Sequence, residues 1–511
     1  MKGKKLVVAL LVVCVLCASC AAFVACDNKT DGKNDKAIIY VTALFAGGLY
    51  DQQTGVAKWE PFETEFDAGK LMAGELGLDE LLDIFEQSGE IPAIIQLAIK
   101  AISYQEDTLL WELTLDNDGV GYNPNIVPAN GLPKDANGKV MDISYGAFGL
   151  YKPFVDNISA KYGSEYDVMV YNQDWRQSPQ KSAAELESFI NAQGYSEVIF
   201  MSQSMGAPVV NSYLARSQSN RDNVKLYMGF APATLGSFDA LAALSCVDVY
   251  VNNFLGGMDL SGLPFDVNQV VGDFVNGKLG DFFRNNIGLM SLVPSWQLIS
   301  SDQYDDDNPA ITIDGEPIST KEELYDFYKS LRWAKYLKFH EETDDDMYLD
   351  EEDIPLYDRV LAQDGEYADK DGYKLKTAAA TLDEYYDSLF VNGKIASESV
   401  NSYYYLGTGS AATITNMKLT TRRDEDGNPL YDAYGCVQYD YELITGGGAE
   451  SKMGDGTVPY YSSIGGNTAT AEYITALGNR LVEIENQGHA NVGLSWDLLG
   501  GYVMALFEQY A

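Results

Sequence analysis

Short apolar runs that end in small or turn-forming residues recur along the chain, and each has the length of one buried strand. Such runs are typical of a parallel sheet, whose strands are covered on both faces. The runs are residues 37–45, 166–171, 197–201, 224–230, 402–406 and 480–485. Residues 182–192 have helical spacing and end before Gly194, and Ser495 is placed to cap a C-terminal helix. Strands alternating with helices predict an α/β fold: a mostly parallel sheet with helices on both faces.

Two long stretches, 60–125 and 235–395, contain no run that we predict as sheet. Within the first, residues 91–102 are apolar nearly all round, which favours a core helix over a helix lying on a lipid surface. In the second, nine of the thirteen residues 341–353 are acidic. That run lacks the spacing of a calcium-binding EF-hand loop, so we expect a solvated loop and no metal site.

The N-terminus has the pattern of an export signal. Three lysines within residues 2–5 precede an uncharged segment, 6–26, and a polar linker follows. Small residues before Cys26 resemble a bacterial lipoprotein box, in which the cysteine is acylated after cleavage; Cys20 is a weaker candidate. An uncleaved anchor is the alternative, because 18 or more apolar residues can span a bilayer. Either arrangement places the remaining chain outside the cytoplasm.

Charge and cysteine content exclude several classes of protein. The formal net charge is −40, and loss of residues 1–25 removes three lysines and no acidic residue. A chain so acidic does not bind nucleic acid through phosphate contacts, which need dense Lys and Arg. Outside the export segment only Cys246 and Cys436 remain. They can form one disulfide or stay as two buried thiols. Two cysteines are too few for a disulfide scaffold, and they do not form a zinc-binding pattern.

Residues 197–208 have the pattern of a nucleophile elbow: a strand, one sharp turn and a helix, with a reactive serine at the corner. The turn needs small residues two positions before and after the serine, and Ser202 and Gly206 meet that need around Ser204. Pro208 falls in the first helical turn, where its missing N–H costs nothing. The pattern predicts an enzyme that transfers acyl groups through Ser204.

A serine nucleophile needs a histidine base that is held by a carboxylate. The chain has two histidines, and only His489 follows the last predicted strand, where the α/β-hydrolase order places the base; His340 lies far from any strand end. Asp455, between two glycines on a predicted tight loop, is the best candidate for the acid among several aspartates. The backbone N–H groups of Met205 and of Leu44 or Phe45 are the expected oxyanion donors.

Together these motifs resemble the lecithin:cholesterol acyltransferase and lysosomal phospholipase family. The resemblance runs from about residue 37 to the end, except for residues 305–395. The segments that carry it are 41–51, 171–176, 202–206, 294–298, 404–409, 454–458 and 488–489. It implies an α/β-hydrolase core with a cap and lid, the triad Ser204, Asp455 and His489, and Leu44 and Met205 as oxyanion donors. The chain departs from the family at Gln203, where histidine is usual, and at Thr42-Ala43, where Pro-Gly is usual.

We therefore expect a fixed order of segments. They are an export signal (1–25), a polar linker (26–36), a first core part (37–234) with a lipid-binding insertion at 60–125, a cap (235–395) and a second core part (396–511). We expect Asp174, Trp175 and Arg176, at a strand end near the site, to be structural, and we expect no cofactor.

The expected function is that of a serine acyl hydrolase or O-acyltransferase acting on lipid esters, tethered to a membrane surface through Cys26. Two alternatives stay open: a soluble carboxylesterase for other acyl esters, and a catalytically inactive surface-binding lipoprotein.

Overall fold

A computed structural model describes much of the chain. The described residues are 34–59, 113, 115, 123–135, 137–246, 249–250, 286–334, 382–432, 435–446, 454–465 and 475–511. The expected export signal and Cys26, the helix at 91–102, His340 and the acidic run at 341–353 lie outside these residues. In the described ranges, no helix is both long and apolar enough to cross a membrane.

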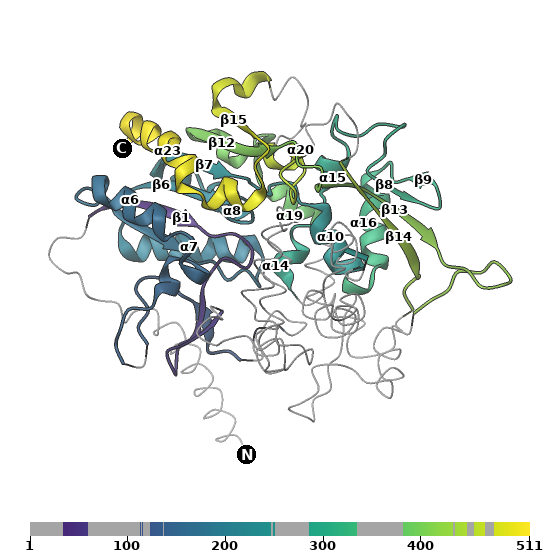
Figure 1. Ribbon diagram of the computed structural model, residues 1–511, viewed down its shortest axis with the longest axis horizontal. Helices are drawn as coiled ribbons and strands as arrows, with labels where there is room; N and C mark the ends of the chain where they lie inside the picture. Colours follow the sequence, from purple (N-terminus) through teal and green to yellow (C-terminus); the bar gives the residue numbers. More distant parts are fainter. Residues whose placement is uncertain are drawn as a thin grey trace, which may run out of the picture.

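The core of the described chain is a six-stranded parallel sheet, in the order β15-β12-β7-β6-β1-β5 (Figure 1). Its strands are β1 (Lys36–Val41), β5 (Asp167–Tyr171), β6 (Glu197–Gln203), β7 (Val224–Phe230), β12 (Ser402–Thr408) and β15 (Leu481–Glu485). All six predicted runs form these strands. The predicted fold class, an α/β-hydrolase fold with a mostly parallel sheet, is confirmed.

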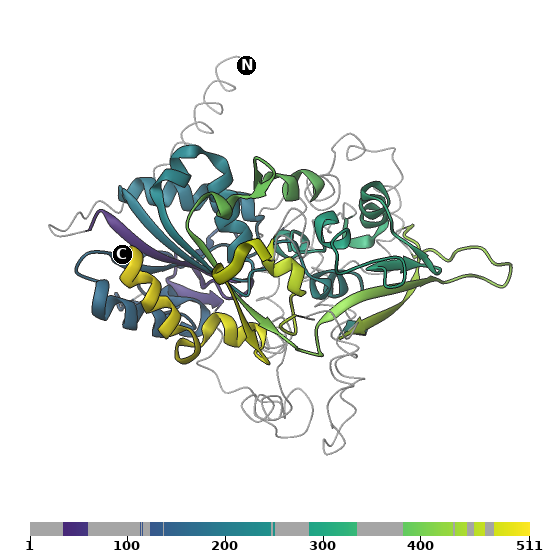
Figure 2. The same cartoon turned by 90° about the horizontal axis from the view of Figure 1, so that it is seen from above.

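Helices cover both faces of this sheet, as Figure 2 shows from above. Successive side chains of a strand point to opposite faces, and β1 divides accordingly. Ile39 and Val41 pack under α7 (Pro179–Gln193) and α8 (Gly206–Arg216). Ile38 and Tyr40 pack under α6 (Lys152–Tyr162) and α23 (Trp496–Tyr510). Burial on both faces explains why these strands are continuous apolar runs.

The predicted helices form with their caps. Helix α7 starts after Ser178, whose side chain accepts the N–H of Lys181, and it ends at Gly194 with φ 73°. Ser495 caps α23 by accepting the N–H of Leu498. A serine at one end and a left-handed glycine at the other are the usual helix boundaries.

A second, four-stranded sheet, in the order β14-β13-β8-β9, lies beside the first (Figure 1). Its strands are β13 (Ile414–Thr421), β14 (Tyr439–Thr445), β8 (Ile311–Ile313) and β9 (Glu316–Pro317). The prediction of no sheet within 235–395 was wrong for four strands that are too short to give a sequence pattern. β8 pairs with β13, and β9 pairs with β8. β10 (Phe390–Val391) and β11 (Lys394–Ile395) pair with each other in a two-stranded sheet. A three-stranded sheet comprises β2 (Leu49–Asp51), β3 (Val56–Trp59) and β4 (Ile126–Pro128).

Short helices surround these sheets. They are α9 (Gln218–Asn223), α10 (Phe238–Ser245), α14 (Ile287–Met290), α15 (Trp296–Ile299), α16 (Lys321–Ser330), α19 (Leu382–Ser388), α20 (Tyr460–Ile464) and α22 (His489–Leu494). Buried residues of α10, α14, α15, α16 and α19 join β13 and the loop after β1 in one apolar cluster. The carboxyl ends of β1 and β6 therefore face an apolar layer.

Candidate active site

Ser204 lies at a sharp turn between β6 and α8. Its φ is +51°, in the left-handed region that non-glycine residues rarely adopt, and its N–H donates to the carbonyl of Phe230 at 3.1 Å. Such backbone strain concentrates at functional sites. Gly206 makes the turn possible, because a Cβ there would lie 2.5 Å from the carbonyl oxygen of Val41. The chain therefore passes from β6 to α8 in one sharp turn at Ser204.

Ser202 occupies the small position before the nucleophile and is completely buried. Its hydroxyl lies 2.9 Å from the hydroxyl of Tyr227, so the pair forms a hydrogen bond between β6 and β7. A buried polar group is tolerated when it is hydrogen-bonded. The hydroxyl pair explains how serine is accommodated at this position.

Asp455 lies beside the carboxyl end of β12, although the β13–β14 excursion separates the two in sequence. Ser410, just after β12, donates its N–H to Gly454 at 3.1 Å. Thr413 accepts the N–H of Gly456 at 2.8 Å through its hydroxyl. A Cβ on Gly407 would come within 2.6 Å of Asp455 Cβ. The loop that carries Asp455 thus packs against the carboxyl end of β12, the strand that precedes β13 and β14 in the chain.

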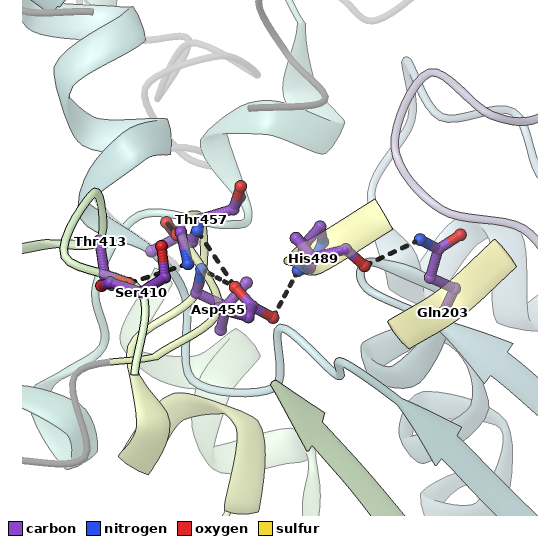
Figure 3. A network of polar contacts seen from close by, with 9 residues as sticks. Gln203, Ser410, Thr413, Asp455, Thr457 and His489 are labelled. Carbon is purple, nitrogen blue, oxygen red and sulfur yellow. Dashed lines mark hydrogen bonds and ion pairs between the residues drawn. The ribbon is translucent and has the colours of Figure 1, made fainter. Parts of the chain in front are cut away.

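His489 and Asp455 form a close, buried pair (Figure 3). His489 Nδ1 lies 2.7 Å from Asp455 Oδ2, and the His489 N–H donates to the carbonyl of Asp455 at 2.9 Å. The other carboxylate oxygen, Oδ1, accepts the N–H groups of Thr457 at 3.1 Å and Val458 at 2.8 Å. The carboxylate is therefore fixed on both sides, and one oxygen is left for the imidazole. This is how an acid orients a histidine base.

Within the described residues, no hydrogen bond joins the Ser204 hydroxyl to the His489 imidazole. The two loops meet at Gln203, whose Nε2 lies 3.5 Å from the carbonyl oxygen of His489. Both Ser204 and His489 are nearly buried. Catalytic hydrogen bonds are often long or unformed without substrate, so the lack of this bond does not argue against a serine–histidine pair.

The loop after β1 provides backbone donors beside the elbow. Ala43 donates its N–H to the hydroxyl of Tyr151 at 3.0 Å, and Ala46 donates to the carbonyl of Ala43 at 3.2 Å, which forms a turn through Leu44. In the described part of the chain, the N–H of Leu44 and the N–H of Met205 donate no hydrogen bond. Unused backbone N–H groups at such a turn and at the N-terminus of α8 can donate hydrogen bonds to an oxygen on which negative charge develops.

Asp174, Trp175 and Arg176 contact one another and neighbouring backbone groups. Asp174 and Arg176 form a buried bidentate ion pair, with Nε–Oδ1 and NH2–Oδ2 distances of 2.8 Å. The guanidinium also donates to the carbonyl of Ile126 at 3.2 Å, and the Trp175 indole donates to Gly47 at 3.1 Å. These contacts join the loop after β5 to β4 and to the loop after β1.

Apolar side chains crowd the elbow. Leu44, Phe45, Trp175 and Met205 belong to one buried cluster with residues of α10 and α14. Gly288 of α14 lies against the Trp175 carbonyl, and a Cβ there would come within 2.8 Å of Met205 Cε. The residues on either side of the Ser204 turn therefore pack in a hydrocarbon environment.

Two further features bear on cofactors and thiols. Among the described residues, no group of three or more His, Cys, Asp or Glu side chains could hold a metal ion. Cys246 and Cys436 are both buried and do not form a disulfide with each other.

The sequence did not indicate two residues of the site. Gln203 appeared there only as a departure from a family pattern, and Tyr151 did not appear at all. In the structure Tyr151 contacts the loop after β1 through Ala43, Gln203 contacts the backbone of His489, and the two side chains are hydrogen-bonded to each other. The contacts span α6, β6 and the loop before α22, so no local motif marks them.

No protein-family model matches the sequence, and no curated protein matches it. In fold, the chain is similar to one chain of the crystal structure of the Tle4–Tli4 complex, with 12% sequence identity and a TM-score of 0.42. The similarity covers 90% of this chain and 94% of that chain. A likeness of this degree assigns no role to any residue, and the candidate site rests on its own contacts.

Proposed function

We propose that the protein is a serine acyl hydrolase or O-acyltransferase that forms an acyl-enzyme on Ser204. The observation that carries the proposal is the buried Asp455–His489 pair, with Nδ1–Oδ2 at 2.7 Å, on the loops that meet the Ser204 elbow. His489 takes the Ser204 proton, Asp455 holds the Nδ1–H, and the oxygen of Ser204 attacks the ester carbonyl. The N–H groups of Leu44 and Met205 stabilise the oxyanion.

The second half of the reaction returns the enzyme to its starting state. His489 gives its proton to the leaving alcohol, which departs as the acyl-enzyme forms. Water or another alcohol then attacks the acyl carbon, and His489 takes its proton. The bond from the acyl carbon to Ser204 Oγ breaks, His489 gives the proton to Oγ, and an acid or a new ester leaves. Both outcomes use the same residues.

We propose lipid esters as the substrate class. The apolar cluster around Leu44 and Met205 supports this, because a fatty acyl chain gains about 25 cal/mol for each Å² of apolar surface that it buries. The resemblance of the motifs to lipid acyltransferases and phospholipases points the same way. A soluble carboxylesterase is the alternative outcome. Turnover of dispersed phospholipid should exceed turnover of monomeric short-chain esters, with a rate that rises above the lipid's aggregation point.

A fluorophosphonate probe tests the nucleophile directly. The wild-type chain should gain one label, and Ser204→Ala should gain none. Ser202→Ala is the matched control, since its hydroxyl lies two residues away and is buried against Tyr227. If the wild-type chain takes no label, the serine-enzyme proposal is refuted, and the inactive surface-binding lipoprotein is favoured.

We also propose that the mature chain begins at an acylated Cys26, which tethers it to the outer face of a cell membrane. The basic, apolar and small residues before Cys26 support this. Mass analysis of the purified N-terminus should find a diacylated cysteine. A chain that retains Met1 or residues 1–25 refutes the lipid anchor.

A further inference from the structure

Gln203 lies between the two catalytic loops and is buried. Its Oε1 accepts the hydroxyl proton of Tyr151 at 2.8 Å, and its Nε2 faces the carbonyl oxygen of His489 at 3.5 Å. Tyr151 in turn accepts the N–H of Ala43 at 3.0 Å. A continuous series of contacts thus runs from the residue before Leu44 to the backbone of His489.

The orientation of the Gln203 amide follows from this series. The Tyr151 oxygen already accepts from Ala43, so its own proton is available to donate, and it must meet an acceptor. This places Oε1 toward Tyr151 and Nε2 toward His489. The order of donors and acceptors therefore determines the orientation of the amide.

Packing reinforces the long Nε2 contact, which exceeds the usual 2.7–3.2 Å. Gly493, in α22, lies so close to Gln203 that a Cβ at that position would overlap the glutamine amide. The carbonyl of Gly493 also accepts the hydroxyl of Tyr40 at 2.6 Å. Helix α22, which begins at His489, is consequently held by both β1 and β6.

We propose that Gln203 is a positioning residue, which couples the loop of the oxyanion donor to the loop of the base. The inference rests on the proposed function. The His489 N–H is fixed by Asp455 at 2.9 Å, and Gln203 restrains its carbonyl. With both backbone groups and Nδ1 held, the imidazole has one direction in which to face Ser204. Through Tyr151, the same side chain restrains Ala43 and so the direction of the Leu44 N–H.

Two substitutions separate this role from simple packing. Gln203→Met keeps most of the volume and removes both polar contacts, while Tyr151→Phe removes the hydroxyl and keeps the ring on Tyr40. The matched control is Tyr404→Phe, which also removes a buried, hydrogen-bonded tyrosine hydroxyl, in that case the partner of Ser397 at 2.8 Å. All variants are compared below their unfolding temperatures by fluorophosphonate labelling rate and by kcat and KM on a soluble short-chain ester.

Gln203→Met should lower the labelling rate and kcat about tenfold and change KM less than about threefold, because the lost contacts act on the reacting groups. Tyr151→Phe should lower kcat less. The double variant should be no slower than Gln203→Met. Both substitutions interrupt the same series of contacts, so the second adds no further loss. The control should match the wild type.

Several outcomes overturn the inference. These are rates within twofold of wild type for both folded single variants, losses that multiply in the double variant, or a change confined to KM. If Gln203→Met does not fold, Tyr151→Phe decides alone. A wild-type chain that takes no label refutes the proposed function together with this inference, whereas a labelled wild type with unaffected variants refutes this inference only.

Discussion

Replacing the Asp455 carboxylate with an amide should disable His489 without disturbing the fold. Asp455 Oδ1 accepts two backbone N–H groups, those of Thr457 and Val458, and Oδ2 faces His489 Nδ1. In Asp455→Asn the carbonyl oxygen must take the Oδ1 position, because an NH₂ there would face two donors. The NH₂ then donates to Nδ1 and forces the neutral imidazole to carry its proton on Nε2. That tautomer cannot accept the Ser204 proton.

The magnitude follows from the two backbone bonds. Turning the asparagine over restores the active tautomer but leaves two buried donors unsatisfied, at about 1–3 kcal/mol each. The active orientation is therefore disfavoured by about 2–6 kcal/mol, or between about 30-fold and 10⁴-fold at about 1.36 kcal/mol for each factor of ten. The corresponding change in a serine-protease triad costs about 10⁴ in kcat. We expect a loss of about 10³-fold.

The assay is the rate of fluorophosphonate labelling, with thermal unfolding measured on the same samples. Asp424→Asn is the matched control, because Asp424 Oδ1 also accepts two backbone N–H groups, from Asp426 at 3.0 Å and Asn428 at 2.8 Å, on an exposed turn without histidine. The control should keep its labelling rate. A folded Asp455→Asn variant that keeps more than about a tenth of the wild-type rate would show that Asp455 does not set the tautomer of His489.

Three further predictions concern stability. Gly206→Ala places a Cβ 2.5 Å from a backbone oxygen and should lower the free energy of unfolding in urea by about 1–3 kcal/mol. The control is Gly501→Ala, whose Cβ meets nothing within 4 Å and should not lower it. Equal losses in the two variants would contradict the clash. Asp174→Ala leaves the Arg176 guanidinium buried without its carboxylate and should lower the free energy of unfolding by about 3–5 kcal/mol. Fluorophosphonate labelling of the folded variant should be unchanged. Lost labelling without lost stability would indicate that Asp174 acts directly in the reaction. Burial, and then the charge of a neighbouring carboxylate, raise the pKa of Asp239 well above its ordinary value, so native Asp239 retains its proton as pH rises. Its contribution to stability is full below the unfolded pKa, about 3.9, and declines toward the folded pKa by about 1.4 kcal/mol per pH unit. Asp239→Asn should therefore gain stability relative to wild type as the pH rises above about 4; a difference independent of pH refutes this.

Much of the core sheet could be predicted from the sequence, because strands buried on both faces leave an uninterrupted apolar signal. The run 224–230 became β7 with the same bounds. The run 37–45 was too long, since β1 ends at Val41 and the chain turns away. Leu44 and Phe45 are apolar because they pack in the cluster beyond the sheet. Hydrophobicity alone does not distinguish burial in a strand from burial in the turn that follows it.

Pairings between distant segments could not be predicted. β8 has only three residues, and its strand conformation depends on β13, about a hundred residues later. The same limit applies to the site. The order of the motifs predicted that Asp455 and His489 lie on neighbouring loops. The hydrogen bonds of Gly454 and Gly456 to residues just after β12 could not be predicted, because they depend on the path of the chain through β13 and β14.

The contacts of Gln203 nevertheless follow from strand geometry. Successive residues of β6 point to opposite faces of the sheet. Ser202 meets Tyr227, whose ring lies in the cluster under α7 and α8, so Gln203 must point to the other face, which α6 covers. Tyr151 and α22 lie on that face. In a sheet with this strand order, the residue before an elbow nucleophile therefore faces the base loop, and a side chain with both a donor and an acceptor can connect that loop to the oxyanion turn. This is why glutamine at position 203 bears on the chemistry of Ser204, although it lies outside the triad.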